Sequence, residues 1–206
     1  MKLNKKIFYK IKKKEINFIT VDGITCSGKS LFASLLKKNL KNKFSEILIL
    51  SKDLFLYPRE KRIKITRNLR TIKKNQNHLH YDLKKLKLLI DFLNGNNKNK
   101  IIILKNLYNR KTGKNNLKMK FNFLKKRLII FEGIYVYEDV NNMIKPILNI
   151  LIIEKVYESL ARKIERIRDK KISIQLVVTE FIKIHLESFK KYLGKKSFDI
   201  AFEDVG

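Results

Sequence analysis

The hydrophobic pattern of this chain alternates between two periods. Short, nearly continuous apolar runs recur along the sequence, and each is typical of a strand that is buried on both faces. Between them lie stretches in which apolar residues are three and four positions apart, as on one face of a helix. This alternation predicts an α/β fold of three layers, α/β/α, with a mainly parallel sheet. The clearest strands are expected at residues 16–21, 47–50, 128–131 and 150–153.

Amphipathic helices are expected between and after these strands, at residues 31–40, 82–94, 156–169 and 173–193. Asp82 and Ser173 can cap the second and fourth of them, and Gly95 and Gly194 can stop the same two. The weaker signals predict a basic lead-in as a short strand or frayed end (1–14), a weakly helical stretch (58–74), a loop (75–77), a strand (101–104), a turn or hairpin (107–113) and a last strand (198–202). No repeat or linker divides the chain, so we expect one domain over residues 1–206.

The chain carries a net charge of +29, with 48 lysines and arginines against 19 acidic residues. Only nine of the 48 are arginines, and the abundance of Lys, Asn and Ile is what AT-rich coding produces. Because arginine is the residue favoured for bidentate phosphate and base contacts, we expect nucleic acid to bind only non-specifically. With Cys26 as the single cysteine, no disulfide can form within the chain, which fits a reducing cytoplasm. No apolar run is long enough to predict a membrane span.

One segment lies between the first predicted strand and the first predicted helix, and it has a sequence of known chemistry. It matches the phosphate-loop pattern G-x-x-x-x-G-K-S/T with the residues Gly23-Ile24-Thr25-Cys26-Ser27-Gly28-Lys29-Ser30. Backbone N–H groups of such a loop curl around a phosphate, and the free N–H groups of the following helix add positive charge. The nucleotide is therefore expected to contact Gly23, Thr25, Cys26, Ser27, Gly28, Lys29, Ser30 and Leu31. Lys29 would reach the β- and γ-phosphates, and the Ser30 hydroxyl would be a ligand of Mg²⁺.

Two acidic residues follow other predicted strands, at the sheet edge where ligands of parallel sheets bind. Asp53 comes three residues after the second strand and is a candidate for the base that orients and deprotonates an attacking hydroxyl, although a helix cap is an equal alternative. Glu132 ends the third of the clearest strands and is a candidate for holding Mg²⁺, with a solvated strand end as the alternative.

Arginines cluster near the last third of the chain. Arg162, Arg166 and Arg168 fall on one predicted helix, where they can close over a transferring phosphate and neutralise its charge. A solvated basic helix face is the alternative. The histidines are less informative: His78 and His80 have no metal-ligand spacing, and His185 is expected to be structural.

Taken in order, these residues resemble the uridine kinase family of P-loop kinases. Beside the phosphate loop, the similar segments are Ser51-Lys52-Asp53-Leu54-Phe55, the pair Tyr81-Asp82, the loop that begins at Tyr108, the segment around Glu132-Gly133, and Leu160 to Asp169 with its arginines. The likeness runs from about residue 16 to the end of the chain. Two features of the family are replaced: its Asp-His-Pro stretch by Asn75-Gln76-Asn77-His78, and a histidine after Tyr108, near whose place Gly113 stands.

The resemblance implies a Mg²⁺-dependent kinase that phosphorylates the 5′-hydroxyl of a pyrimidine nucleoside with ATP or GTP. Asp53 would then be the general base, and Arg162, Arg166 and Arg168 would belong to a lid. Tyr81 and Tyr108 would flank the base by stacking, and Asp82 would bind the sugar unless it caps the helix. Two alternatives stay open, a kinase of another metabolite and a nucleotide-regulated protein that binds nucleic acid. A cytoplasmic location is expected, and assembly into a homo-oligomer is left open.

Overall fold

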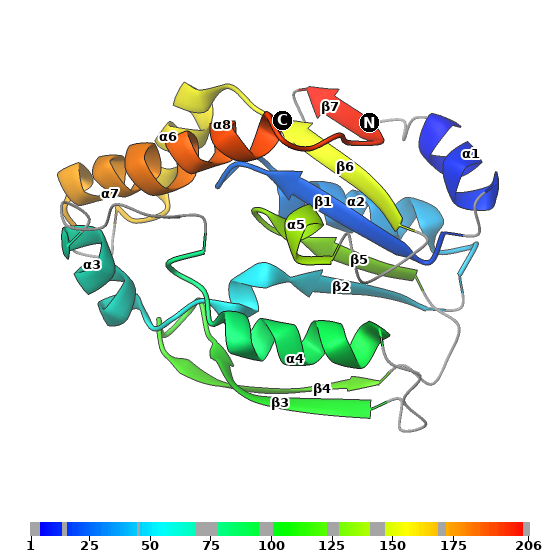
Figure 1. Cartoon of the computed structure of the whole chain (residues 1–206), viewed down its shortest axis with the longest axis horizontal. Helices are drawn as coiled ribbons and strands as arrows, with labels where there is room; N and C mark the ends of the chain where they lie inside the picture. The colour runs from blue at the N-terminus through cyan, green and yellow to red at the C-terminus, as the bar shows by residue number, and fades with distance from the viewer. Residues whose placement is uncertain are drawn as a thin grey trace.

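The computed structural model of the chain contains one five-stranded sheet in which every neighbouring pair of strands is parallel (Figure 1). The structure describes residues 5–13, 16–44, 46–68, 78–94, 101–122, 128–140, 147–168 and 172–203. The strands lie in the order β2-β5-β1-β6-β7. Their bounds are β1 Phe18–Gly23, β2 Ile47–Ser51, β5 Leu128–Glu132, β6 Ile147–Ile153 and β7 Ile200–Glu203. The predicted α/β class and the clearest strands are confirmed.

The strand order reverses at β1. From β1 the chain goes to β2 on one side, and it later reaches β6 on the other side of β1. In such sheets the crevice at the carboxyl ends of the strands, where the order reverses, is the usual ligand site. The segments after β1, β2 and β5 therefore meet at one edge, and Ser51 pairs with Glu132 in the register of β2 and β5.

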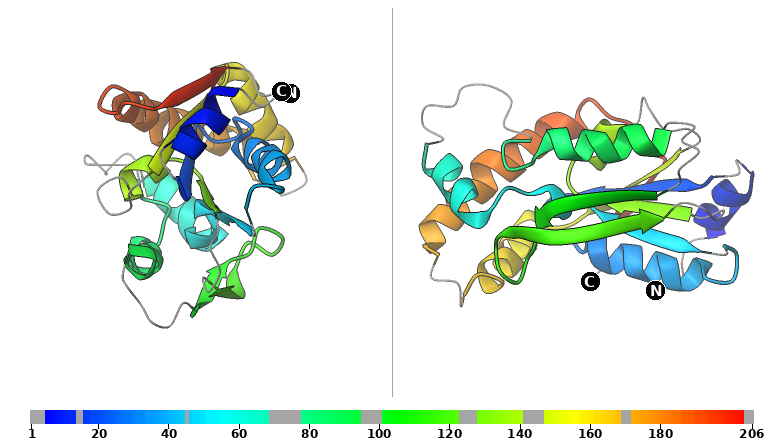
Figure 2. Two further views of the ribbon diagram at one scale, coloured as in Figure 1. Left: turned by 90° about the vertical axis from the view of Figure 1, so that its right-hand side faces the viewer. Right: turned by 90° about the horizontal axis from the view of Figure 1, so that it is seen from below.

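Side chains of the central strands alternate between two apolar layers, as the pleat of a sheet requires. Ile19 and Val21 pack in the same core cluster as α1 (Lys5–Lys13) and α2 (Lys29–Leu40). Phe18 points to the opposite layer, which includes α4 (Leu83–Asn94) and α5 (Val136–Val140). Figures 1 and 2 show helices on both faces of the sheet, which confirms the three predicted layers.

The basic lead-in forms a helix, so the expectation of a strand or frayed end was wrong for α1. Ile7 and Ile11, four residues apart, are almost fully buried against the sheet layer. Together with the partly buried Phe8, these apolar side chains dock a short helix whose other positions are mostly lysine.

A separate antiparallel hairpin is formed by β3 (Ile101–Tyr108) and β4 (Asn115–Asn122), at the bottom of Figure 1. The predicted strand at residues 101–104 thus extends to Tyr108, and the turn spans residues 109–114. Leu104, Leu107 and Phe121 of the hairpin belong to the apolar cluster that contains α4. The hairpin and α4 lie together below the central sheet, and Figure 2 shows this from a second direction.

The remaining elements are η1 (Lys52–Phe55), α3 (Arg59–Arg67), α6 (Val156–Glu165), α7 (Ile174–Glu180), η3 (Phe181–Leu186) and α8 (Glu187–Leu193). The last three form one continuous helical stretch, as predicted for residues 173–193, but its middle segment, η3, is a π-helix. The expectations for Gly95, for residues 75–77 and for Asp169 lie outside the described residues.

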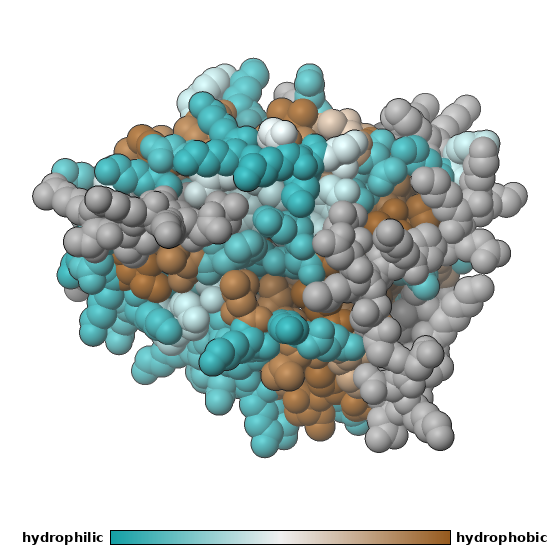
Figure 3. Space-filling view, in the orientation of Figure 1, coloured by the Kyte–Doolittle hydropathy of each residue, from teal (hydrophilic) through white to brown (hydrophobic). Residues whose placement is uncertain are grey.

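Polar side chains cover most of the face in Figure 3, and apolar ones gather around α4 and the hairpin. Exposed apolar residues there include Leu83 and Leu88 of α4 and Ile103 of β3. Among the helices of the described ranges, none has the length and apolarity needed to cross a membrane.

Candidate active site

The loop between β1 and α2 has the backbone geometry of a phosphate cradle. Cys26 and Gly28 have positive φ values of 64° and 81°, which turn the chain tightly ahead of the helix. A Cβ at Gly23 would lie 2.5 Å from Ser27 Oγ and 2.8 Å from the carbonyl oxygen of Ile152, so only glycine fits this position. The first hydrogen bond of helix α2 runs from the N–H group of Phe32 to the Gly28 carbonyl. The N–H groups of residues 29–31, at the start of the helix, therefore have no acceptor within it.

Lys29 is the buried cation of this loop. Its ammonium group donates to the Ile24 carbonyl at 2.5 Å and lies 3.5 Å from Ser27 Oγ. Burial lowers the pKa of Lys29, and the nearby carboxylates of Glu132 and Asp53 oppose that shift. The Lys29 side chain is thus held at the loop, near the two negative charges of Glu132 and Asp53.

Asp53 is the second residue of η1, two positions after the end of β2, and its own N–H group donates to Ser51 Oγ at 3.3 Å. Its carboxylate is paired with the guanidinium of Arg110, which comes from the turn between β3 and β4. The negative charge of Asp53 raises the pKa of Arg110, and the burial of Arg110 opposes that rise. Sequence reasoning missed Arg110, because an arginine in a polar turn has no local signal of a role.

Glu132 ends β5 and is buried beside the phosphate loop. Burial and the neighbouring charge of Asp53 raise its pKa, while a hydrogen bond from Ser51 and the charges of Lys29 and Arg110 oppose the rise. The carboxylates of Glu132, which ends β5, and of Asp53, which follows the adjacent strand β2, therefore repel each other beside the phosphate loop. The alternative of a solvated strand end does not describe this buried side chain.

The three candidate arginines separate in the structure. Arg162 lies on α6 and donates to Glu154 at 2.6 Å, with Glu158 at 3.5 Å. Because α6 ends at Glu165, Arg166 and Arg168 lie in the following turn, so the single predicted helix was wrong here. Arg166 is exposed at the cavity, whereas Arg168 is exposed outside its described lining.

A cavity of about 270 Å³ joins these groups. Its lining includes residues 25–31 of the phosphate loop and the predicted Asp53, Tyr81, Glu132, Arg162 and Arg166, together with the unexpected Arg110, Ile134 and His185. Gly23, Asp82, Tyr108 and Arg168 are not among the described lining residues. Most of the predicted site is thus brought together, from segments more than 100 residues apart.

The three predicted acceptor residues have different surroundings. Tyr81 is buried at the cavity wall. Asp82 caps α4, because its Oδ1 accepts the N–H of Lys85 at 3.2 Å, as the alternative interpretation expected. The Tyr108 hydroxyl accepts from Arg62 at 2.7 Å, and the guanidinium of Arg62 lies over the same ring. Tyr108 therefore connects the hairpin to α3 through Arg62.

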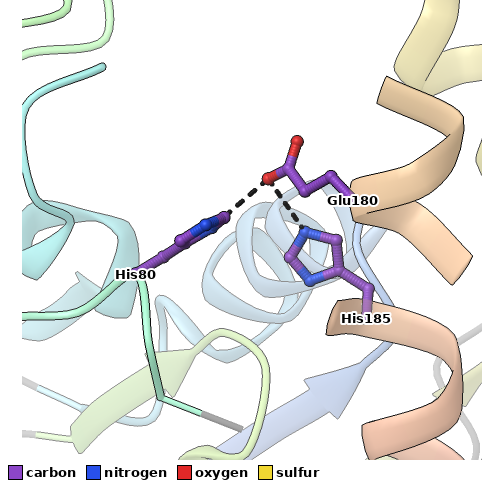
Figure 4. A group of neighbouring side chains, drawn as sticks. All are labelled: His80, Glu180 and His185. Carbon is purple, nitrogen blue, oxygen red and sulfur yellow. Dashed lines mark hydrogen bonds and ion pairs between the residues drawn. The ribbon is translucent and has the colours of Figure 1, made fainter. Parts of the chain in front are cut away.

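A buried polar cluster borders the cavity where His185 lines it (Figure 4). His80 Nδ1 and His185 Nε2 each lie 3.3 Å from Glu180 Oε1, and Lys163 pairs with the other oxygen at 3.1 Å. Burial opposes ionisation of Glu180, but Lys163 and the imidazoles outweigh it and hold the pKa well below its usual range. The π-helix turns Glu180 and His185, five residues apart, toward each other.

No protein-family model matches the sequence, and no curated protein matches it. Solved structures do match. A protein of Bacillus stearothermophilus described as a possible uridine kinase aligns at 16% identity with a TM-score of 0.62, covering 98% of this chain and 100% of its own. Phosphoribulokinase from Rhodobacter spheroides aligns at 13% identity and 0.57, covering 91% and 70%. D-Glycerate 3-kinase from Cryptococcus neoformans aligns at 10% identity and 0.54, covering 90% and 87%.

The fold is that of the P-loop kinases. The names of these three structures refer to three different acceptors, so the shared fold does not select one of them. Identities this low carry the arrangement of strands and helices alone. The function of this chain has to be inferred from its own cavity.

Proposed function

We propose that this chain is a Mg²⁺-dependent kinase that transfers the γ-phosphoryl group of ATP or GTP to a hydroxyl of a small molecule. One observation carries the proposal: the phosphate loop with Lys29, the two carboxylates of Asp53 and Glu132, and the arginines of the α6 region line a single cavity. Phosphoryl transfer needs little covalent chemistry from a protein, and it depends on positioning and on stabilising charge. This set of side chains supplies both.

The reaction places each group in a definite role. The acceptor oxygen forms a bond to the γ-phosphorus while the bond from that phosphorus to the bridging oxygen breaks, and the nucleoside diphosphate leaves. Asp53 accepts the proton of the attacking hydroxyl. Lys29 turns from the Ile24 carbonyl to the phosphate oxygens, while Arg162 and Arg166 neutralise charge on the transferred group.

The donor set also suits a divalent cation. Glu132 and Asp53 repel each other in a buried place, and a cation between nucleotide and carboxylate would offset that repulsion. Glu132 and the Ser30 hydroxyl are the groups that would hold Mg²⁺ there. When bound, Mg²⁺ draws charge from the phosphate oxygens.

For the acceptor, a pyrimidine nucleoside is the candidate that the sequence resemblance suggests. Tyr81 at the cavity wall supports it, since an aromatic ring can stack on a flat base. The positions of Tyr108 and Asp82 outside the described lining withdraw two of its three expected contacts. A phosphorylated sugar or a hydroxy acid is the alternative that the other kinases of this fold suggest.

Two variants test the proposal. Lys29→Ala should abolish acceptor-dependent ADP release, with Lys38→Ala, an exposed lysine of the same helix, as the matched control. Asp53→Asn should lower kcat far more than it changes ATP binding, because the base acts mainly in the transition state. Undiminished turnover by Lys29→Ala would exclude the proposed nucleotide site. A parallel loss of ATP affinity and kcat in Asp53→Asn would make Asp53 a metal ligand instead of the base.

A nucleotide-regulated protein that binds nucleic acid makes the opposite prediction. It would bind polynucleotides at physiological salt and respond to ATP, whereas a basic kinase would lose such binding as salt screens the charge. Polynucleotide affinity measured against salt, with and without ATP, distinguishes the two.

A further inference from the structure

The candidate base of this site is neutralised by a neighbour. The carboxylate of Asp53 forms an ion pair with the guanidinium of Arg110. A carboxylate oxygen that already accepts a hydrogen bond from a guanidinium is occupied, so a hydroxyl of the acceptor has to compete with Arg110 for it. Whatever binds next to Asp53 must therefore attract Arg110 away from it.

The backbone of the turn that carries Arg110 is held by hydrogen bonds, whereas the Arg110 side chain is mostly exposed. Asn109 and Gly113 close the turn with backbone bonds of 2.8 Å, and the Arg59 N–H group donates to the Gly113 carbonyl at 2.9 Å. Gly113 has a φ of 75°, and a Cβ there would lie 2.8 Å from the Arg59 guanidinium carbon. The Arg110 side chain is nevertheless 61% exposed. A fixed backbone thus presents a guanidinium that can change partners.

The exchange of partners is easy. An ion pair with so exposed a member contributes little to stability, so Arg110 can leave Asp53 for a second anion without loss to the fold. Phosphate and carboxylate groups match a guanidinium with two parallel hydrogen bonds. A neutral hydroxyl or a base offers no comparable attraction.

Arg110 reaches the cavity from a different part of the fold than Arg162. It comes from the turn of the hairpin, at the bottom of Figure 1, whereas Arg162 comes from α6 at the top. The phosphate loop, Arg162 and Arg166 already supply cations for a nucleotide, which leaves Arg110 as a further positive charge at the base. Arg59 and Arg62, which form no ion pair with a carboxylate of the described ranges, add to the positive potential beside the turn.

We infer that the acceptor is a small hydroxyl compound that carries its own anionic group, and that this group takes the guanidinium of Arg110 and so frees Asp53. The inference rests on the proposed kinase function, and among the acceptors named there it favours a phosphorylated sugar or a hydroxy acid over the neutral nucleoside. An anionic acceptor activates the base that deprotonates it, whereas water or a neutral alcohol leaves the base paired. The same exchange limits wasteful hydrolysis of ATP.

Matched pairs of acceptors test the inference in the full-length protein. The pairs are glycerol with glycerate, and ribulose with ribulose 5-phosphate, and uridine serves as the neutral nucleoside. The readout is acceptor-dependent ADP release, and the two charged compounds distinguish a carboxylate from a phosphate. We expect the charged member of at least one pair to have a kcat/KM about 100-fold above that of its neutral partner, as loss of a charged hydrogen bond implies.

Two variants locate the effect. Arg110→Gln should reduce kcat/KM for the anionic acceptor about 10- to 100-fold through KM and leave the KM for ATP unchanged. Lys114→Gln removes a positive charge from the same exposed turn and should change neither constant. An equal loss with charged and neutral acceptors, or a raised KM for ATP, would assign Arg110 to the transferred phosphate and overturn the inference.

A binding measurement separates this inference from the kinase function. The same compounds are titrated by calorimetry into the protein saturated with a non-hydrolysable ATP analogue. Anion binding that Arg110→Gln weakens, without ADP release from any acceptor, would refute the kinase function and keep the anion site. Turnover of uridine with no preference for charged compounds would keep the kinase function and refute the anion site.

Discussion

Replacing Lys52 with methionine is expected to destabilise the fold strongly, because Lys52 is a fully buried cation. Its ammonium group lies 2.7 Å from Asp139 Oδ2 and 3.3 Å from His78 Nδ1. The rings of Tyr81 and Tyr135 have their centroids 4.8 and 5.6 Å from it. Methionine keeps most of the volume of the side chain but leaves the carboxylate of Asp139 buried without its partner.

The size of the loss follows from that orphaned charge. Removing one partner of a buried ion pair costs about 3–5 kcal/mol. With an m-value of about 2–3 kcal/mol/M, the midpoint of urea unfolding should fall by about 1–2.5 M. Lys52→Met combined with Asp139→Asn should be more stable than Lys52→Met alone, because the second change removes the unpaired charge.

The pH dependence provides the sharper test. Burial raises the pKa of Asp139 to about 6, and Lys52 opposes the rise, so the pKa should rise further in Lys52→Met. A carboxyl whose pKa is raised in the folded state binds protons that the unfolded chain has released, so the free energy of unfolding falls as pH increases toward that pKa. The deficit of Lys52→Met should therefore be larger at pH 8 than at pH 5. Equal deficits at both values, or a loss below about 1 kcal/mol at pH 8, would mean that the pair is not buried as described.

Three further changes have defined outcomes. Gly133→Ala should cost about 1–3 kcal/mol of unfolding free energy, because its Cβ would lie 2.6 Å from that of Lys52, whereas the Cβ of Gly194→Ala would make only ordinary contacts, at 3.8 and 3.9 Å, and this change should be neutral in the same urea titration. Asp82→Ala should cost about 1 kcal/mol through the lost cap and leave the acceptor KM unchanged; a raised KM would return Asp82 to the substrate site. Burial lowers the pKa of His185 to about 4, so wild type should lose up to about 3 kcal/mol as pH falls from 6.5 to 4, and His185→Gln should show a shallower fall.

The parts of the site that the sequence predicted are those encoded by contiguous residues. The phosphate loop is one uninterrupted segment between a strand and a helix, and Asp53 and Glu132 follow strands whose carboxyl ends must meet in a parallel sheet. Arg110 escaped prediction because its contact with Asp53 spans 57 positions and depends on how the hairpin packs. Nothing in the residues around it distinguishes it from a solvated turn.

Two other features of the site also have causes that the sequence pattern does not show. Tyr108 was expected at the substrate, but its hydroxyl and ring are engaged by Arg62, a contact between α3 and the hairpin that no periodicity reveals. His185 was expected to be structural, and its contact with Glu180 is compatible with that; its place in the cavity lining was not foreseen, because a π-helix changes the angle between successive side chains. A hydrophobic pattern with a period of 3.6 residues cannot anticipate that change.

The hairpin has a further consequence for how such a protein can change. Its two strands pair only with each other and lie outside the five-stranded sheet. Residues can be inserted, lost or exchanged at residues 109–114 without altering the register of β1, β2 or β5, on which the phosphate loop and both carboxylates depend. In the proposed kinase, acceptor choice would thus be physically separable from phosphoryl transfer. Transplanting this turn between proteins of the fold would exchange one property and preserve the other, and evolution has had the same freedom.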